Sequence, residues 1–158
     1  MINLPQAINL ATKAHKGQWR KPTIAKPHYI LESGDEIYKQ EMVLFIRKPY
    51  ITHPLAVMDM MSTEEEKIIA VLHDVLKDTD ITTAYLKHQG VPSHLIDSLE
   101  WLTPIKGESY EDYIKNITEN KLATKVKLAD IFHNLSCNPS EQAKQKYLKA
   151  IPILLQNI

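Results

Sequence analysis

The stretch Ile69–Asp80, IAVLHDVLKDTD, decides how the rest of the sequence is interpreted. Its apolar residues recur at helical spacing, which predicts a core helix: Ile69, Val71, Leu72, Val75 and Leu76. His73 and Asp74 interrupt that apolar run. A carboxylate is almost never fully buried unless it is paired or binds a metal. Because neighbouring helix residues lie about 100° apart around the axis, both side chains can converge on one ion, provided that the chain supplies further ligands.

The length and composition favour one helical domain. A chain of 158 residues can bury a sizeable core. It contains only four glycines and few alternating β-branched runs, which argues against a β-rich fold, whereas long apolar-periodic segments predict an all-helical one. We therefore expect residues 1–158 to form a single all-α domain.

The overall charge narrows the classes of partner. Lys plus Arg and Asp plus Glu both number 19, so a neutral chain gives no global electrostatic reason to expect nucleic acid or an anionic membrane. Local basic patches remain possible, and His15, Arg20 and Lys21 form a small basic cluster beside Trp19. The single cysteine, Cys137, excludes an intrachain disulfide and a cysteine-rich zinc site. No signal peptide and no membrane-spanning run is recognisable, which predicts a cytoplasmic protein.

Helix signals recur along the chain. Thr63 and Glu66 have the spacing of a capping box, Pro54 suits a first helical turn, and Pro152 is expected to kink or break the last helix. Ser93 is the expected cap of its helix, in which Trp101 is expected to point inward. The predicted helices cover 4–16, 54–61, 64–79, 81–89, 92–102, 109–117, 122–135 and 141–156.

Residues 22–48 are the least regular part of the chain. Pro22, Pro27, Gly34 and Pro49 punctuate the stretch, and an apolar run spans Met42–Ile46. We interpret it as an inserted loop, either irregular or hairpin-like. Connections of this length are usually functional lids or mobile segments.

Two further residues resemble the His-Asp pair in their setting. His53 precedes a helix-starting proline, and Asp130 interrupts the apolar helix KVKLADIFHNL. Two imidazoles and two carboxylates favour Mn, Fe or Zn over Ca or Mg. An ion with open positions can bind phosphate oxygens and activate a water. Taken singly, each histidine is more often structural, and Asp130 has the alternative of an ion pair with Lys125 or Lys127.

Longer motifs carry a family resemblance. ATKAHKGQWRK, PYITHPLAV, AVLHDVLKDTD, ESYEDYI and VKLADIFHN occur in that order over roughly residues 7 to 136. The order H…HD…D resembles the HD superfamily of metal-dependent phosphohydrolases. The longer stretches resemble the hydrolase domain of the RelA/SpoT family and its small single-domain relatives. The resemblance implies an all-helical fold, a Mn²⁺ site, and removal of the 3′-pyrophosphate from the guanine nucleotide (p)ppGpp.

The resemblance also implies roles for individual residues. His53, His73, Asp74 and Asp130 match the metal ligands. The basic pair Arg20 and Lys21 matches residues near the nucleotide. Asn134 matches a polar residue beside the ligand site, and it lies one helical turn after Asp130, which puts both on one helix face.

The sequence departs from the family in the residues that act on water. The family's HDxxED pattern has Glu then Asp, whereas this chain has Lys77 and Asp78. Asp78 can still serve as a general base or position a water. Lys77 is either a solvated residue at a helix end or a phosphate-binding cation, and it could leave the site slow or inactive. Ile131 also stands where the family has arginine.

Two rival functions follow from these departures. The insertion at 22–48 favours an HD phosphohydrolase that acts on another nucleotide or small phosphoester. Lys77 favours a metal-bound nucleotide sensor with little or no catalysis. Other residues have open alternatives: His133 either supports a metal ligand or is structural, and Tyr110 and Tyr113 approach a nucleotide or pack against the helix of Trp101. His28, His88 and His94 are expected to be exposed.

Overall fold

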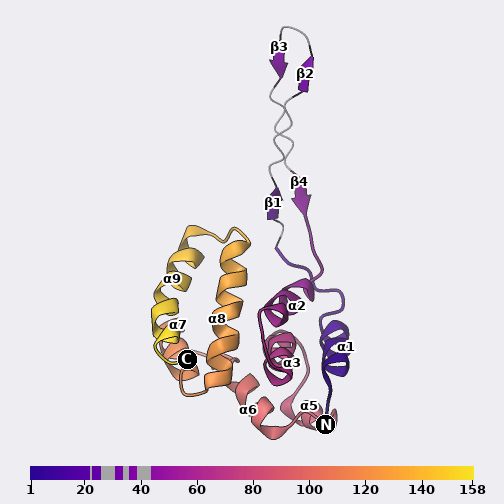
Figure 1. The fold of residues 1–158 in the computed structure, drawn as a ribbon, viewed down its shortest axis with the longest axis vertical. Coiled ribbons are helices and arrows are strands. Elements are labelled where there is room, and N and C mark those ends of the chain that lie inside the picture. Colours follow the sequence, from indigo (N-terminus) through magenta and orange to yellow (C-terminus); the bar gives the residue numbers. More distant parts are fainter. Residues whose placement is uncertain (22, 26–30, 34–35, 39–43) are drawn as a thin grey trace.

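The computed structural model describes residues 1–21, 23–25, 31–33, 36–38 and 44–158. Within these ranges the chain forms a helical body from which a hairpin arm projects (Figure 1). The described helices are α1 (Leu4–Ala14), α2 (Thr52–Asp59), α3 (Glu64–Leu72), α4 (Val75–Asp78), α5 (Thr83–His88), α6 (Ser93–Trp101), α7 (Tyr110–Ile117), α8 (Lys121–Ser136) and α9 (Glu141–Leu155). The described strands are β1 (Thr23–Ala25), β2 (Leu31–Ser33), β3 (Glu36–Tyr38) and β4 (Leu44–Ile46).

Helix α3 lies at the centre of the body. It packs against α1, α2, α6 and α8, and its residues from Ile68 to Leu72 are all buried. The predicted capping box starts it: Glu66 N–H donates to Thr63 Oγ1 (3.2 Å), and Thr63 N–H donates to Glu66 Oε2 (3.1 Å). Lys125 of α8 donates to Glu66 Oε1 (2.7 Å) and ties the two helices together. This framework makes the C-terminal end of α3 a rigid place for polar side chains.

The predicted helix over 64–79 is interrupted at its His-Asp pair. Helix α3 ends at Leu72 and α4 begins at Val75, so the expectation of one continuous helix is wrong at this point. Asp74 has φ −99° and ψ −3°, in the bridge region rather than at helical values. Its carboxylate accepts a hydrogen bond from Tyr50 of another segment, and this tertiary contact competes with helix continuation.

Two smaller expectations at helix ends are also wrong. Pro92, not Ser93, is the N-cap of α6, and no side chain caps that end. Trp101, the last residue of α6, is 40% exposed instead of pointing inward. Helix α9 continues through Pro152 to Leu155 without a break. For α6 the pattern located the helix and missed the detail of its two ends, whereas for α9 only the break at Pro152, one of the two expected outcomes, is contradicted.

The insertion forms the arm. β1 pairs antiparallel with β4, with Thr23 opposite Ile46, and β2 pairs antiparallel with β3, with Leu31 opposite Tyr38. The fold prediction of an all-α bundle with a hairpin-like insertion is therefore confirmed. Pro22, Pro27, Gly34, Met42 and the neighbouring residues of that prediction lie outside the described ones, as does His28. None of the described helices has the length and apolar character needed to cross a membrane.

A short strand pair joins the arm to the body. Trp19 pairs with Pro49 in an antiparallel bridge. Arg20 N–H donates to the carbonyl of Lys48, and Tyr50 N–H donates to the carbonyl of Gln18, each at 2.9 Å. Residues 18–21 and 47–50 therefore lie side by side just before α2 begins, which brings the two polar segments flanking the insertion together.

Candidate functional site

The structure brings the four predicted metal ligands together. His53 lies in the first turn of α2, His73 and Asp74 at the break between α3 and α4, and Asp130 in α8; all four are buried. His53 Nε2 is 3.0 Å from Asp130 Oδ1, and His73 Nε2 is 3.0 Å from Asp74 Oδ2. Ligand atoms of His53, His73 and Asp130 all lie within 4.8 Å of one another, a spacing that could hold a metal ion.

The imidazole of His73 is oriented as a metal ligand requires. Its Nδ1 lies 2.7 Å from the carbonyl of Ala70, which can only accept, so Nδ1 carries the hydrogen. In the neutral ring the buried Nε2 atom therefore carries a lone pair, and this atom has no hydrogen-bond partner. That lone pair faces Asp74 Oδ2, another acceptor, so a proton or a cation has to separate the two atoms. Without an ion, burial lowers the pKa of His73 but Asp74 and Asp130 outweigh it, raising the pKa to about 8.

His53 is held by a second histidine. His53 Nδ1 lies 2.7 Å from His133 Nδ1, so one ring donates to the other. Burial, with nearby positive charge, lowers the pKa of His133 to about 4, so this ring is neutral and can accept. With the hydrogen on His53 Nδ1, the Nε2 lone pair points toward Asp130. The structure thus places His133 directly against a predicted ligand, in the position of a supporting residue.

Both carboxylates of the cluster are ionised. Burial raises the pKa of Asp130, but the nearby Lys127, His53 and His73 outweigh it and hold that pKa below its ordinary value. Burial likewise raises the pKa of Asp74, and His73 and Lys77 outweigh it. Lys127 Nζ is 3.0 Å from Asp130 Oδ2, so the ion pair considered from the sequence is also present. Asp130 Oδ2 faces the lysine, whereas Oδ1 faces the histidines and also accepts a hydrogen bond from Asn134 Nδ2.

Tyr50 is a site residue that the sequence reasoning missed. Its hydroxyl lies 2.6 Å from Asp74 Oδ2 and 3.2 Å from Asp78 Oδ2. Burial and the two carboxylates raise its pKa, so the hydroxyl stays protonated and donates. Its position three residues before His53 was the available signal. His15, assigned from the sequence to a small basic cluster with Arg20 and Lys21, is buried, with its ring centroid 4.8 Å from that of Tyr50.

The structure leaves both predicted alternatives for Lys77 open. Its side chain is 46% exposed, and its Nζ lies 3.5 Å from Asp74 Oδ1 and 3.3 Å from Asp78 Oδ2. The lysine is therefore a half-exposed cation between a predicted ligand and the predicted base. Asp78 is not among the described residues that line the adjoining cavity, whereas Lys77 is. Ile131, where the family has arginine, is fully buried in the core.

A cavity of about 380 Å³ opens over the cluster. Arg20 and Asn134, predicted to bind nucleotide, both line it: Arg20 Nη2 donates to Asn134 Oδ1 (3.0 Å), and Asn134 Nδ2 donates to Asp130 Oδ1 (2.6 Å). Lys21 is exposed and is not among the described lining residues. Lys146 and Tyr147, which also line the cavity, had no distinguishing sequence signal, and Lys127 was considered from the sequence only as an ion-pair partner of Asp130. Four basic side chains line this cavity, a charge pattern suited to an anionic ligand: Arg20, Lys77, Lys127 and Lys146.

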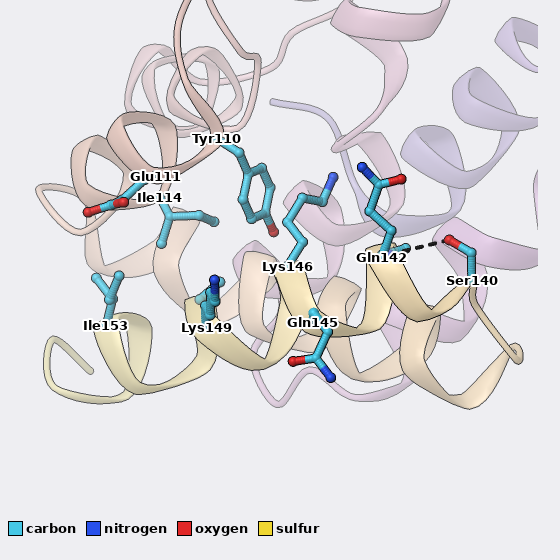
Figure 2. Close-up of a pocket in the computed structure, with 11 residues that line it drawn as sticks. Tyr110, Glu111, Ile114, Ser140, Gln142, Gln145, Lys146, Lys149 and Ile153 are labelled. Carbon is cyan, nitrogen blue, oxygen red and sulfur yellow. Dashed lines mark hydrogen bonds between the residues drawn. The ribbon is translucent and has the colours of Figure 1, made fainter.

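Both tyrosines of α7 line the cavity, and Tyr113 also packs as the simpler interpretation expected. The hydroxyl of Tyr113 donates to the carbonyl of Leu102, just after α6, at 2.6 Å. Tyr110 faces Lys146 of α9, whose Nζ is 4.3 Å from the ring centroid (Figure 2). Tyr110 and Lys146 line both the cavity and a larger groove of about 880 Å³ between α7 and α9, so the cavity and the groove adjoin.

Comparisons with known proteins agree with the fold and with the family resemblance. The chain is 31% identical over 140 residues to guanosine-3′,5′-bis(diphosphate) 3′-pyrophosphohydrolase of Haemophilus influenzae, covering 80% of this chain. It is 27% identical over 135 residues to a protein of Mycobacterium leprae named probable GTP pyrophosphokinase, covering 73% of this chain. The chain spans only 17% of the length of each of these relatives. No family model matches it.

The fold is similar to that of a solved structure. That structure is described as a metazoan orthologue of SpoT that hydrolyses ppGpp and plays a role in starvation responses. The TM-score is 0.66 with 20% sequence identity, over 98% of this chain and 84% of that one. The helical body and the His-Asp cluster are those that the resemblance to the HD superfamily implied. Within that class, the resemblance of the chain to the hydrolase domain of the RelA/SpoT family is confirmed.

Proposed function

We propose that this chain is a metal-dependent phosphohydrolase that removes the 3′-pyrophosphate of guanosine 3′,5′-bis(diphosphate). One observation carries the proposal: two imidazoles and two ionised carboxylates from three separate segments meet at the wall of a cavity that basic side chains also line. The named activity of the Haemophilus relative supports the same substrate. We propose further that residues 1–158 act as one HD domain; the cytoplasmic location stays a prediction.

The donor set fits a divalent cation. The lone pair on His73 Nε2 is buried, and His53 Nε2 lies against Asp130 Oδ1. These electron-rich atoms repel one another unless a positive charge lies between them. His53, His73, Asp74 and Asp130 would hold the ion, and their mixed nitrogen and oxygen set suits Mn²⁺. A divalent ion supplies charge that polarises a phosphate oxygen and lowers the pKa of a water.

The other side chains around the cluster would have separate roles in binding and catalysis. Asp78 would accept the proton of the attacking water, while Tyr50 holds this carboxylate beside Asp74. Lys77 would neutralise part of the charge that develops on the phosphate. Arg20 and Asn134 would bind the nucleotide, since they line the cavity together. The geometry gives Lys21 no comparable position, so its predicted contact with the nucleotide rests on the resemblance alone.

A substrate panel with Mn²⁺ tests the proposal. The purified chain would be incubated with ppGpp, GTP, nucleoside monophosphates and small phosphoesters, and release of pyrophosphate and phosphate measured separately. We expect pyrophosphate from ppGpp at the highest kcat/KM. A preference for a monophosphate would instead favour the rival HD phosphohydrolase that the inserted arm suggested.

A nucleotide sensor is the second candidate, because Lys77 forms ion pairs with both Asp74 and Asp78. These contacts would weaken a base and compete with the ion. Binding of ppGpp to Mn²⁺-loaded protein in calorimetry, without product after prolonged incubation, would support the sensor. Measurable turnover that disappears in Asp130→Asn would exclude it.

A further inference from the structure

The two sides of the strand pair at the root of the arm carry different chemistry. Alternate residues of an extended strand point to opposite faces. Arg20 points to the cavity over the ligand cluster, where it meets Asn134 and lies 5.9 Å from the Tyr50 ring centroid. Trp19 lies on the other face and is 51% exposed, with the Arg47 guanidinium 6.0 Å from its ring. The root of the arm therefore presents an outer surface that is separate from the cavity.

We define the arm root as Trp19, Lys21 and Arg47, all exposed. Lys48 lies opposite Arg20 and therefore shares the face of Arg20. Arg20 N–H bonds to Lys48 C=O, so the backbone sets cationic residues of the two strands side by side. Like charges opposite each other across a strand pair are destabilising. Among the described residues, none of Lys21, Arg47 and Lys48 has a carboxylate within ion-pairing distance. The cations are concentrated here without internal compensation.

The neutral total charge conceals this concentration. Residues 1–31 contain five Lys or Arg and no Asp or Glu, and residues 42–58 contain Arg47 and Lys48 and again no acid. Trp19 of the first segment pairs with Pro49 of the second, and β1 and β4 leave the helical body beyond this bridge (Figure 1). Along the chain between the two segments, the nearest acids are Glu32 and Glu41, so the sequence around the bridge itself carries only positive charge.

We propose that the arm root binds an unpaired polynucleotide strand, with its phosphates on Lys21 and Arg47 and a base stacked on Trp19. An exposed indole beside a guanidinium, flanked by a lysine, is the combination by which proteins hold single strands without reading their sequence. The surface is a narrow strand pair with one exposed aromatic side chain, which matches a strand better than a membrane. The overall charge had argued against nucleic acid, and the arm root is a local exception.

The test is fluorescence anisotropy of a labelled twelve-nucleotide oligouridine with the full chain, over a series of salt concentrations. We expect a Kd on the order of 10⁻⁵ M at low salt that weakens steeply as salt rises. Lys21→Glu with Arg47→Glu should weaken binding more than tenfold and lower the salt slope by about 1.4, or about 0.7 for each phosphate that is no longer neutralised. Trp19→Ala should weaken binding about fivefold or more and leave the salt slope unchanged, since stacking releases no counterions.

A matched variant separates this surface from the charge of the whole chain. Lys87→Glu with Lys121→Glu changes the net charge by the same amount as the first double variant, at exposed lysines of α5 and α8. This control should leave binding intact. Equal weakening by both double variants would overturn the proposal, as would an unchanged affinity in Trp19→Ala. Polyglutamate or anionic phosphatidylserine vesicles bound as tightly as the oligonucleotide would also overturn it, because neither offers a base to stack. Failure of the oligonucleotide to bind at low salt would do the same.

Discussion

The two halves of the candidate site differ in burial and in composition. The predicted ligands His53, His73, Asp74 and Asp130 are each less than a tenth exposed and pack between three helices. Lys77 and Asp78, at the end of α4, have side chains that are 46% and 30% exposed. Buried charge is tolerated only when it is compensated, so the side chains packed around the four buried residues have to balance their charges. The second half is solvated, and this is where the chain departs from its family.

The largest expected effect comes from the buried half. Replacing Asp130 by Asn removes the charge that both histidines and Lys127 face, so we expect Mn²⁺-dependent hydrolysis to fall on the order of 10³-fold. Bound metal, measured on the purified protein, should fall with it. Asp112→Asn, at an exposed acid of α7, is the control. Retention of both metal and activity in Asp130→Asn would refute the proposed ligand set.

The pH dependence of the metal-free protein sharpens the comparison. The pKa of His73 is raised from 6.5 to about 8 on folding, so protonation of His73 stabilises the fold fully below pH 6.5. That contribution, about 2 kcal/mol, is lost as the pH rises through 8. Urea unfolding in EDTA at pH 6 and pH 8.5 should show the loss, and His73→Gln should reduce it. Mn²⁺ requires the neutral ring, so its affinity should rise over the same interval.

Tyr50 connects the two halves, and its hydroxyl can be removed alone. Tyr50→Phe keeps the ring and deletes the hydrogen bonds to Asp74 and Asp78, so kcat should fall about tenfold with KM little changed. Tyr113→Phe is matched, since that hydroxyl also lies in the cavity wall but bonds the Leu102 carbonyl. If both variants lose activity equally, the tyrosine hydroxyls act through packing and Tyr50 has no special place between the acids.

The smallest effect is expected at the solvated half. Lys77→Glu introduces the acid of the family pattern and removes a cation beside Asp74. Mn²⁺ binding should tighten about fivefold, which corresponds to the upper end of the energies measured for half-exposed ion pairs. If the lysine impairs the site, turnover should also rise; if it holds phosphate, KM should rise instead. Lys77→Met, which removes the charge alone, separates the two. An unchanged metal affinity in both variants would show that Lys77 is a solvated residue without influence on the cluster.

Local patterns were sufficient for the helices and for the ligand types. Capping residues such as Thr63 and Ser109 start helices where expected, because a cap acts within one turn. His73, Asp74 and Asp130 were recognisable because each interrupts an apolar run, where a polar group needs a partner. Tyr50, Lys127 and Lys146 stand in no such contrast with their neighbours. Their roles depend on contacts across the chain that no short window contains.

The sequence by itself therefore determined the helical class, the inserted hairpin and the chemistry of the ligand cluster, since spacing and burial are local properties of a helix. Only the tertiary structure decided which atoms meet. It interrupted the central helix so that Asp74 reaches Tyr50, and it set Lys77 between two carboxylates. It also turned Arg20 into the cavity and left Trp19 outside it, because adjacent residues of an extended strand face opposite ways.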